Sequence, residues 1–209
     1  RGLAQAASAH GRVASLVLPA DVSWNKGGVA AEPLDPAAPG RPDPSAIAKA
    51  AHALRSGRKA LILLGTPAVQ VDLHPLLAGI ARATDAMLMA SPTISALPRG
   101  RGRLALPPVP YSVDQAIREL APYDVLILVN CPPPVGFFLY PGRPSYMQRS
   151  DAEIVTLSRE DQDAAAALQA LAAALDASPA GIPVQSVDIP PATGPITTRN
   201  VSSPSYTSS

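Results

Sequence analysis

Cysteine, aromatic and charged residues are all scarce in this chain of 209 residues. The single cysteine, Cys131, excludes an intrachain disulfide and a cysteine-based zinc site, and it favours a reducing, cytoplasmic setting. Aromatic residues make up only 4%, which argues against a base-stacking surface, and a net charge of +1 gives no reason to expect nucleic acid or an anionic membrane. No signal-peptide pattern is present, and no apolar run approaches the roughly 20 residues of a membrane span.

The chain also lacks a recognisable catalytic or metal-binding pattern. His10, His52 and His74 are scattered, with no H-x-x-x-H or H-E-x-x-H pair that could hold a metal ion. Cys131 follows an apolar run and has no evident base partner, so packing is the expected role of its side chain. The sequence therefore predicts no catalytic residue and no metal ligand.

Apolar runs are plentiful, because 47% of the residues are hydrophobic. Lys59–Leu64 and Asp124–Val129 are apolar at almost every position, which is typical of parallel strands covered on both faces. Shorter strands are predicted at Ala86–Ala90 and Glu153–Leu157. Helices that alternate with the strands are predicted, the first opened by Asp43-Pro44 before the first strand and the third by a Ser112-x-x-Gln115 capping box. The pattern indicates an α/β fold: a mostly parallel sheet with helices on both faces and every strand covered.

The flanking segments are less regular. Val13–Leu18 is a strand candidate that cannot bury itself alone, so we expect it to belong to a sheet whose other members are missing. Residues 29–42 form a linker rich in proline and alanine. We expect the α/β domain to span 43–182 and a linker with a disordered Ser/Thr tail to span 183–209. The chain begins with Arg1 in what reads as mid-domain sequence, so we expect a fragment.

Three stretches are candidate binding surfaces. Gly65-Thr66 follows a buried strand, where open α/β sheets place ligands, but a single glycine is also explained by a tight turn. The arginines of the glycine-rich loop, Arg99, Arg101 and Arg103, could hold a phosphate, or could simply be solvated. The apolar run Phe137–Tyr140 predicts a hydrophobic plug or, as we favour, a contact to another subunit.

Several of these stretches together resemble thiamine-diphosphate-dependent enzymes, in particular acetolactate-synthase-like large subunits. Ser15–Val22 resembles the closing strand of the first, pyrimidine-binding domain, which would make residues 1–28 its C-terminal remnant. Arg58–Gly65 with Pro67-Ala68 resembles the opening strand and turn of the Rossmann-like central domain. Gly100–Arg103, Asp124–Val129 and Phe137–Gly142 are similar to later parts of that domain, and Gly194–Thr197 is similar to the start of the bridge to the third.

The resemblance implies a central domain with a six-stranded parallel sheet that binds FAD or ADP in some members. It implies a parent enzyme, a lyase or transferase, that is a homo-oligomer and acts on 2-keto acids with thiamine diphosphate and Mg²⁺. The activating glutamate and the GDG metal-diphosphate motif of such enzymes do not occur in this sequence, so we expect the chain alone to be inactive.

Two functions remain open on this basis. The first is a structural central domain that packs against the remaining domains of the parent enzyme. The second is a stand-alone module, either binding a nucleotide through Gly65, Thr66, Arg101 and Asn130 or acting as an inactive interaction module.

Overall fold

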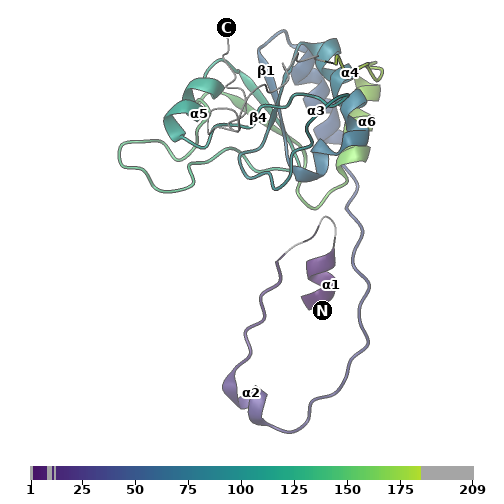
Figure 1. Cartoon of the computed structure of the whole chain (residues 1–209), viewed down its shortest axis with the longest axis vertical. Helices are drawn as coiled ribbons and strands as arrows, with labels where there is room; N and C mark the ends of the chain where they lie inside the picture. Colours follow the sequence, from purple (N-terminus) through teal and green to yellow (C-terminus); the bar gives the residue numbers. More distant parts are fainter. Residues whose placement is uncertain (1, 9–10, 12, 185–209) are drawn as a thin grey trace, which may run out of the picture.

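The computed structural model describes residues 2–8, 11 and 13–184, and it shows an α/β unit preceded by a long extended segment (Figure 1). We call residues 13–39 the arm; it carries the short helix α2 (Ala20–Trp24), and α1 (Gly2–Ala7) precedes it. Val13–Leu18 forms no strand with the described residues, and its place in a sheet whose other strands lie elsewhere stays a prediction. A strand requires a neighbour to pair its backbone, and this segment pairs with none of the described residues, with Val13 96% exposed. The tail expected at 197–209 lies outside the described residues.

A parallel sheet forms the centre of the molecule. Its strands are β1 (Ala60–Leu64), β2 (Met87–Ala90), β3 (Val125–Val129) and β4 (Glu153–Ser158), in the order β2-β1-β3-β4. All three strand pairs are parallel. These strands confirm the four predicted from the apolar runs, and the α/β fold class with them. The resemblance implied six strands, whereas residues 2–8, 11 and 13–184 supply four.

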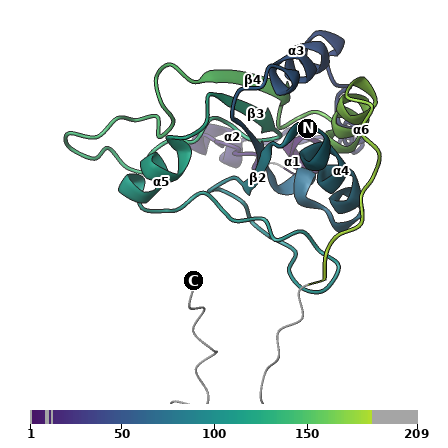
Figure 2. The same cartoon turned by 90° about the horizontal axis from the view of Figure 1, so that it is seen from above.

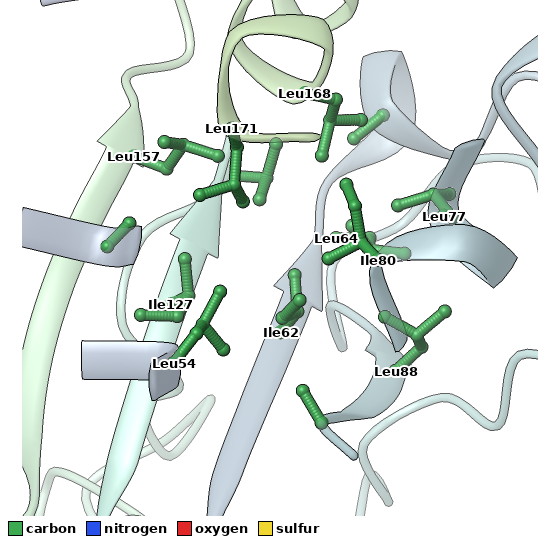
Figure 3. Packing of buried hydrophobic residues seen from close by; sticks show 14 of the residues in the cluster. Leu54, Ile62, Leu64, Leu77, Ile80, Leu88, Ile127, Leu157, Leu168 and Leu171 are labelled. Atoms are coloured by element: carbon green, nitrogen blue, oxygen red, sulfur yellow. The ribbon is translucent and has the colours of Figure 1, made fainter. Parts of the chain in front are cut away.

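Helices cover the two faces of the sheet unequally (Figure 2). α3 (Pro44–Arg55), α4 (His74–Thr84) and α6 (Ala164–Ala174) pack on one face, and α5 (Val113–Leu120) packs on the other. Figure 3 shows the core under the three helices, where Ile62 and Ile127 of the central strands meet leucines from each helix. The sequence between β1 and α4 forms two short 3₁₀ helices, Thr66–Val69 and Val71–Leu73.

The face under α5 is covered over the two central strands and over Met89 of β2, and it is open at Met87 and along β4. One row across the sheet joins Met87, Leu61, Leu126 and Ile154, one residue from each strand. Leu61 and Leu126 are completely buried, whereas Met87 is 42% exposed and Ile154 is 38% exposed. The expectation that every strand is covered on both faces is therefore wrong for β4, whereas β2 is open only at its first residue, Met87. Its physical reason is that the connection from β3 to β4 contains no helix that would cover β4.

Only one of the two predicted helix starts uses its side chain as expected. Asp43 caps α3 by accepting a hydrogen bond from the Ser45 backbone N–H at 2.8 Å. Ser112 stands at the start of α5, but its side chain makes no capping hydrogen bond, so the predicted capping box is wrong. Ser112 is exposed, and water can satisfy the N–H groups that a capping box would have bonded.

The arm enters the α/β unit through a set of hydrogen bonds that we call the clip. The Gly40 N–H donates to the Asp161 carbonyl, and the Asp163 N–H donates to the Gly40 carbonyl, each at 2.8 Å. The Gln162 side chain adds a third bond by donating to the Arg41 carbonyl at 2.7 Å. The clip fixes the end of the arm to the turn between β4 and α6.

Gly79 allows the chain to cross closely over α4. A Cβ atom at this position would lie 2.1 Å from the Ser178 carbonyl oxygen, and the Ala180 N–H donates to the Pro75 carbonyl nearby. Replacing glycine by alanine in a helix normally stabilises it by about 1 kcal/mol. We expect Gly79→Ala to have the opposite sign and to cost about 2–4 kcal/mol, because backbone atoms must move apart.

Urea unfolding followed by circular dichroism measures this cost. Tryptophan fluorescence is unsuitable, since Trp24, the only tryptophan, lies on the arm and is 84% exposed. Ala83→Gly, at an exposed position of the same helix, is the control and should cost about 1 kcal/mol. A Gly79→Ala variant as stable as the wild type would contradict the close crossing.

Candidate functional site

A cleft of about 390 Å³ lies at the carboxyl ends of the strands, beside the point where the chain order reverses between β1 and β3. Open α/β sheets place small ligands at this point. Gly11 of the N-terminal segment lines the cleft. The rest of the lining combines polar and small apolar groups from the ends of all four strands and the loops that follow them: Gly65, Thr66, Pro67, Gln70, Ser91, Thr93, Ile94, Ser95, Asn130, Cys131, Pro132 and Glu160. The site predicted from sequence therefore coincides in part with this cleft.

Gly65 and Thr66 both line the cleft, and the structure gives each a local role. The Gly65 N–H donates to the Val129 carbonyl at 2.8 Å, and a Cβ atom at Gly65 would lie 2.0 Å from the Asn130 carbonyl oxygen. Glycine is required because two strand ends approach closely. The Thr66 hydroxyl lies 3.2 Å from the Ser95 hydroxyl and accepts the Ser95 N–H. It ties the loop after β2 to the end of β1.

Asn130 lines the cleft as a bracing residue. Its amide nitrogen donates to the carbonyls of Arg159 and Gln162 at 2.8 and 2.7 Å, and its amide oxygen accepts the Ser158 hydroxyl at 2.8 Å. The side chain is buried and the backbone is left-handed, with φ of 52°. The three bonds use both N–H donors of the side-chain amide and one lone pair of its oxygen. Asn130 therefore joins the ends of β3 and β4.

Arg101 does not lie in the lining of the cleft, and neither do Arg99 and Arg103. The three arginines occupy an exposed turn, in which Arg103 donates to the Arg99 carbonyl at 2.6 Å. The structure thus brings Gly65, Thr66 and Asn130 together and leaves Arg101 apart. The nucleotide site that combined these four residues stays a prediction.

Two lining or supporting residues were not singled out from the sequence. Glu160 adds a carboxylate to the cleft. His74 is completely buried beneath the loop after β2: its Nδ1 accepts the Leu104 N–H at 3.0 Å, so its Nε2 is the nitrogen that donates to the Val69 carbonyl, at 3.1 Å. A lone histidine carries no pattern from which this bracing role could be predicted.

Cys131 also lines the cleft, yet its thiol is poorly suited to nucleophilic chemistry. The side chain is buried, and its thiol donates to the Leu63 carbonyl at 3.3 Å. Burial is the main cause that raises the pKa of the Cys131 thiol to about 12, and Glu160 adds to the increase. Within residues 2–8, 11 and 13–184, no group of three or more His, Cys, Asp or Glu side chains could hold a metal ion.

The raised pKa of Cys131 predicts a loss of stability at alkaline pH. The unfolded chain ionises its thiol from about pH 9, while the folded chain keeps the proton until about pH 12. The unfolding free energy should therefore fall with rising pH in this window, by up to about 1.4 kcal/mol per pH unit from this group. Urea unfolding at pH 8, 9.5 and 10.5 measures the fall. Cys131→Ala is the control and should lose this part of the pH dependence. If the unfolding free energy fell equally steeply with pH in both proteins, the raised pKa of the Cys131 thiol would be contradicted.

The comparisons with known proteins agree with this fold. The chain is 36% identical over 168 residues to a protein of Mycobacterium tuberculosis described as "Putative acetolactate synthase large subunit IlvX", a match that covers 80% of this chain and 32% of that protein. No family model matches. The chain thus spans about a third of the length of the curated relative that it matches.

Two solved structures share the architecture. One is a Mycobacterium smegmatis protein described as a "putative thiamin diphosphate-dependent enzyme", with a TM-score of 0.52, 15% identity and coverage of 78% of this chain and 33% of the other. The other is benzoylformate decarboxylase from Polynucleobacter necessarius, with a TM-score of 0.53, 13% identity and coverage of 84% and 34%. At these identities the likeness shows a shared fold.

The α/β unit thus has the fold found in a segment of thiamine-diphosphate-dependent enzymes. Over 80% of its length the chain is also similar in sequence to the curated protein described as an acetolactate synthase large subunit.

Proposed function

We propose that this chain is a structural central domain of a thiamine-diphosphate-dependent, acetolactate-synthase-like enzyme. In this proposal the α/β unit packs against the other domains and supplies no group to the chemistry. The whole enzyme would be cytoplasmic and oligomeric, and would join or decarboxylate 2-keto acids using thiamine diphosphate and Mg²⁺.

The chemistry of the cleft supports a structural role. Among the described residues that line it there is no lysine, arginine or histidine, and Glu160 is the one charged side chain. A carboxylate repels the diphosphate of thiamine diphosphate, FAD or ADP. The side chains of Thr66 and Asn130 already form hydrogen bonds with neighbouring segments of the same chain. The described residues therefore do not fit a diphosphate in this cleft.

Turnover of 2-keto acids tests the structural role. The 209-residue chain is incubated with pyruvate or benzoylformate, thiamine diphosphate and Mg²⁺, and decarboxylation is followed by release of CO₂. We expect no turnover above a protein-free blank, and a benzoylformate decarboxylase serves as the positive control for the assay. Turnover by this chain would overturn the proposal.

A nucleotide-binding module is the second candidate, favoured by the position of the cleft at the reversal point of the sheet. A ligand at 100 times its Kd stabilises the folded state by about 2.7 kcal/mol, which gives a thermal shift of several degrees. Adenosine, ADP and FAD, each at about 1 mM, should leave the melting temperature unchanged if the role is structural. A shift with ADP or FAD that Arg101→Ala or Thr66→Val abolishes would establish the second candidate instead.

A further inference from the structure

The cleft at the carboxyl ends of the strands carries a carboxylate that has no partner among the described residues. Glu160 is exposed in the lining, and the neighbouring Arg159 forms its ion pair with Asp161, at 3.3 Å. No ion pair within residues 2–8, 11 and 13–184 includes Glu160. Its charge is felt inside the cleft: burial is the main cause of the raised pKa of the Cys131 thiol, and Glu160 raises this pKa further. The described lining therefore has a negative electrostatic potential.

Four hydroxyl groups also line the cleft, and they form two pairs. The Thr66 and Ser95 hydroxyl oxygens lie 3.2 Å apart, and the Ser91 and Thr93 hydroxyl oxygens lie 3.1 Å apart. One oxygen of each pair also accepts a backbone N–H group, from Ser95 at 3.2 Å and from Thr93 at 3.4 Å. A hydroxyl group has one donor and two acceptor positions, so each pair retains about two acceptor positions for one O–H donor. The hydroxyl pairs therefore offer more acceptors than donors.

The other polar groups of the lining use their donors mostly within the chain. The side-chain amides of Asn130 and Gln70 donate to backbone carbonyls, and so does the Cys131 thiol. Pro67 and Pro132 have no N–H group, whereas a phosphate site relies on several backbone N–H groups. The cleft thus presents acceptors and a negative charge, which is the opposite of what an anionic ligand requires.

We propose that the cleft binds a small organic cation, a protonated amine whose ammonium group bonds to Glu160 and to the hydroxyl oxygens of the lining. An ammonium group donates three hydrogen bonds and accepts none, so it is complementary to this lining in charge and in hydrogen bonding. Ile94, Pro67 and Pro132 supply apolar contacts for a short carbon chain. The volume of about 390 Å³ lies near the lower limit for ligand sites, which restricts the ligand to a small molecule. This site goes beyond the proposed structural role, which assigns no ligand to the cleft.

A series of four-carbon compounds that differ in charge tests this proposal. The ¹⁵N-labelled 209-residue chain is titrated with 1,4-diaminobutane, 4-amino-1-butanol, 1,4-butanediol and succinate, each up to about 20 mM, and amide chemical shifts are followed by NMR. We expect saturable shifts with the two amines, gathered at the amides of Gly65, Ser95 and Cys131. The Kd of each amine should rise with salt concentration, because salt screens exposed charges. The diol should bind at least about 5-fold more weakly, and succinate should not bind.

Variants of the lining identify the groups that hold the amine. Glu160→Gln keeps the size of an exposed side chain but removes its charge, so it should fold normally and weaken binding of both amines by about 5–10-fold. Thr93→Val removes one hydroxyl group at an exposed position and should weaken binding by about 3-fold, as for one hydrogen bond. Glu119→Gln is the matched control. It removes an exposed carboxylate from α5, on the other face of the sheet, and should leave the Kd unchanged.

The proposal would be overturned by the absence of saturable shifts with either amine up to about 20 mM. Equal amine affinity of Glu160→Gln and the wild type would overturn it too, and so would shifts that cluster away from the cleft lining. If ADP or succinate bound as tightly as the amines, the negative potential of the cleft would be wrong and the nucleotide-binding module would be favoured instead.

The amine site and the proposed function are tested separately. Keto-acid turnover by this chain would overturn the structural role and would leave the amine titration unaffected. Failure of both amines to bind would remove the site and leave the structural role in the parent enzyme intact.

Discussion

Gly65→Ala is expected to lower the unfolding free energy by about 4 kcal/mol or more. The new Cβ atom would lie 2.0 Å from the Asn130 carbonyl oxygen and 2.7 Å from its carbon, so two backbones at the ends of β1 and β3 must separate. Both strands are buried along their whole length, and the core has no room to absorb the shift. Because single domains are stable by only about 5–15 kcal/mol, much of the stability would be lost.

The urea midpoint by circular dichroism measures this loss. Gly28→Ala and Gly181→Ala serve as controls, since a Cβ atom at either position meets nothing within 4 Å. Both should stay within about 0.5 kcal/mol of the wild type. If Gly65→Ala folded with wild-type stability, the close approach of β1 to Asn130 would be wrong. The alternative explanation, that glycine at position 65 lets a ligand approach the backbone, would then be favoured.

Asn130→Asp is expected to cost about 3–5 kcal/mol at pH 7. The substitution keeps the size of the side chain but replaces two N–H donors by an oxygen that faces the Arg159 and Gln162 carbonyls. A buried, unpaired negative charge results. Asn130→Gly, which adopts the left-handed backbone without strain, loses the same bonds without the charge and should cost about 2 kcal/mol.

The pH dependence separates the charge from the lost bonds. Burial and the two carbonyls raise the pKa of the introduced carboxyl above its unfolded value, so the folded variant takes up its proton first as the pH falls. The deficit of Asn130→Asp should therefore shrink between pH 7 and pH 4, while that of Asn130→Gly stays level. Equal and pH-independent losses in both variants would contradict the hydrogen bonds assigned to Asn130.

The sheet could be predicted from sequence because the residues of β1 and β3 are themselves apolar at every position. A run such as Leu61–Leu64 is apolar on both faces wherever the rest of the chain goes. Val13–Leu18 has a similar composition but no partner among the described residues, and a strand without a partner is not formed. Composition predicts a preference for extended backbone, whereas pairing depends on distant segments.

The site was harder to predict than the fold, since its residues act through contacts between distant segments. Gly65 and Thr66 were placed correctly at the end of a strand, but the reason for Gly65 is the backbone of Asn130. Arg101 was grouped with them by its charge and by the resemblance of Gly100–Arg103 to a loop of the central domain, and the turn that carries it lies outside the cleft lining. The crossing of residues 178–180 over Gly79 leaves no local pattern at all. The open face of β4 at Ile154 depends on a helix that does not form between β3 and β4.

The clip connects the end of the arm to the lining of the cleft through hydrogen bonds. Gln162 holds the Arg41 carbonyl with its side chain, and its own carbonyl accepts a bond from Asn130 at the cleft floor. Gln162 thus links Arg41, just after the arm, to Asn130 and through it to the ends of β3 and β4. Residues 40–41 and the cleft lining at Asn130 therefore belong to one hydrogen-bonded network.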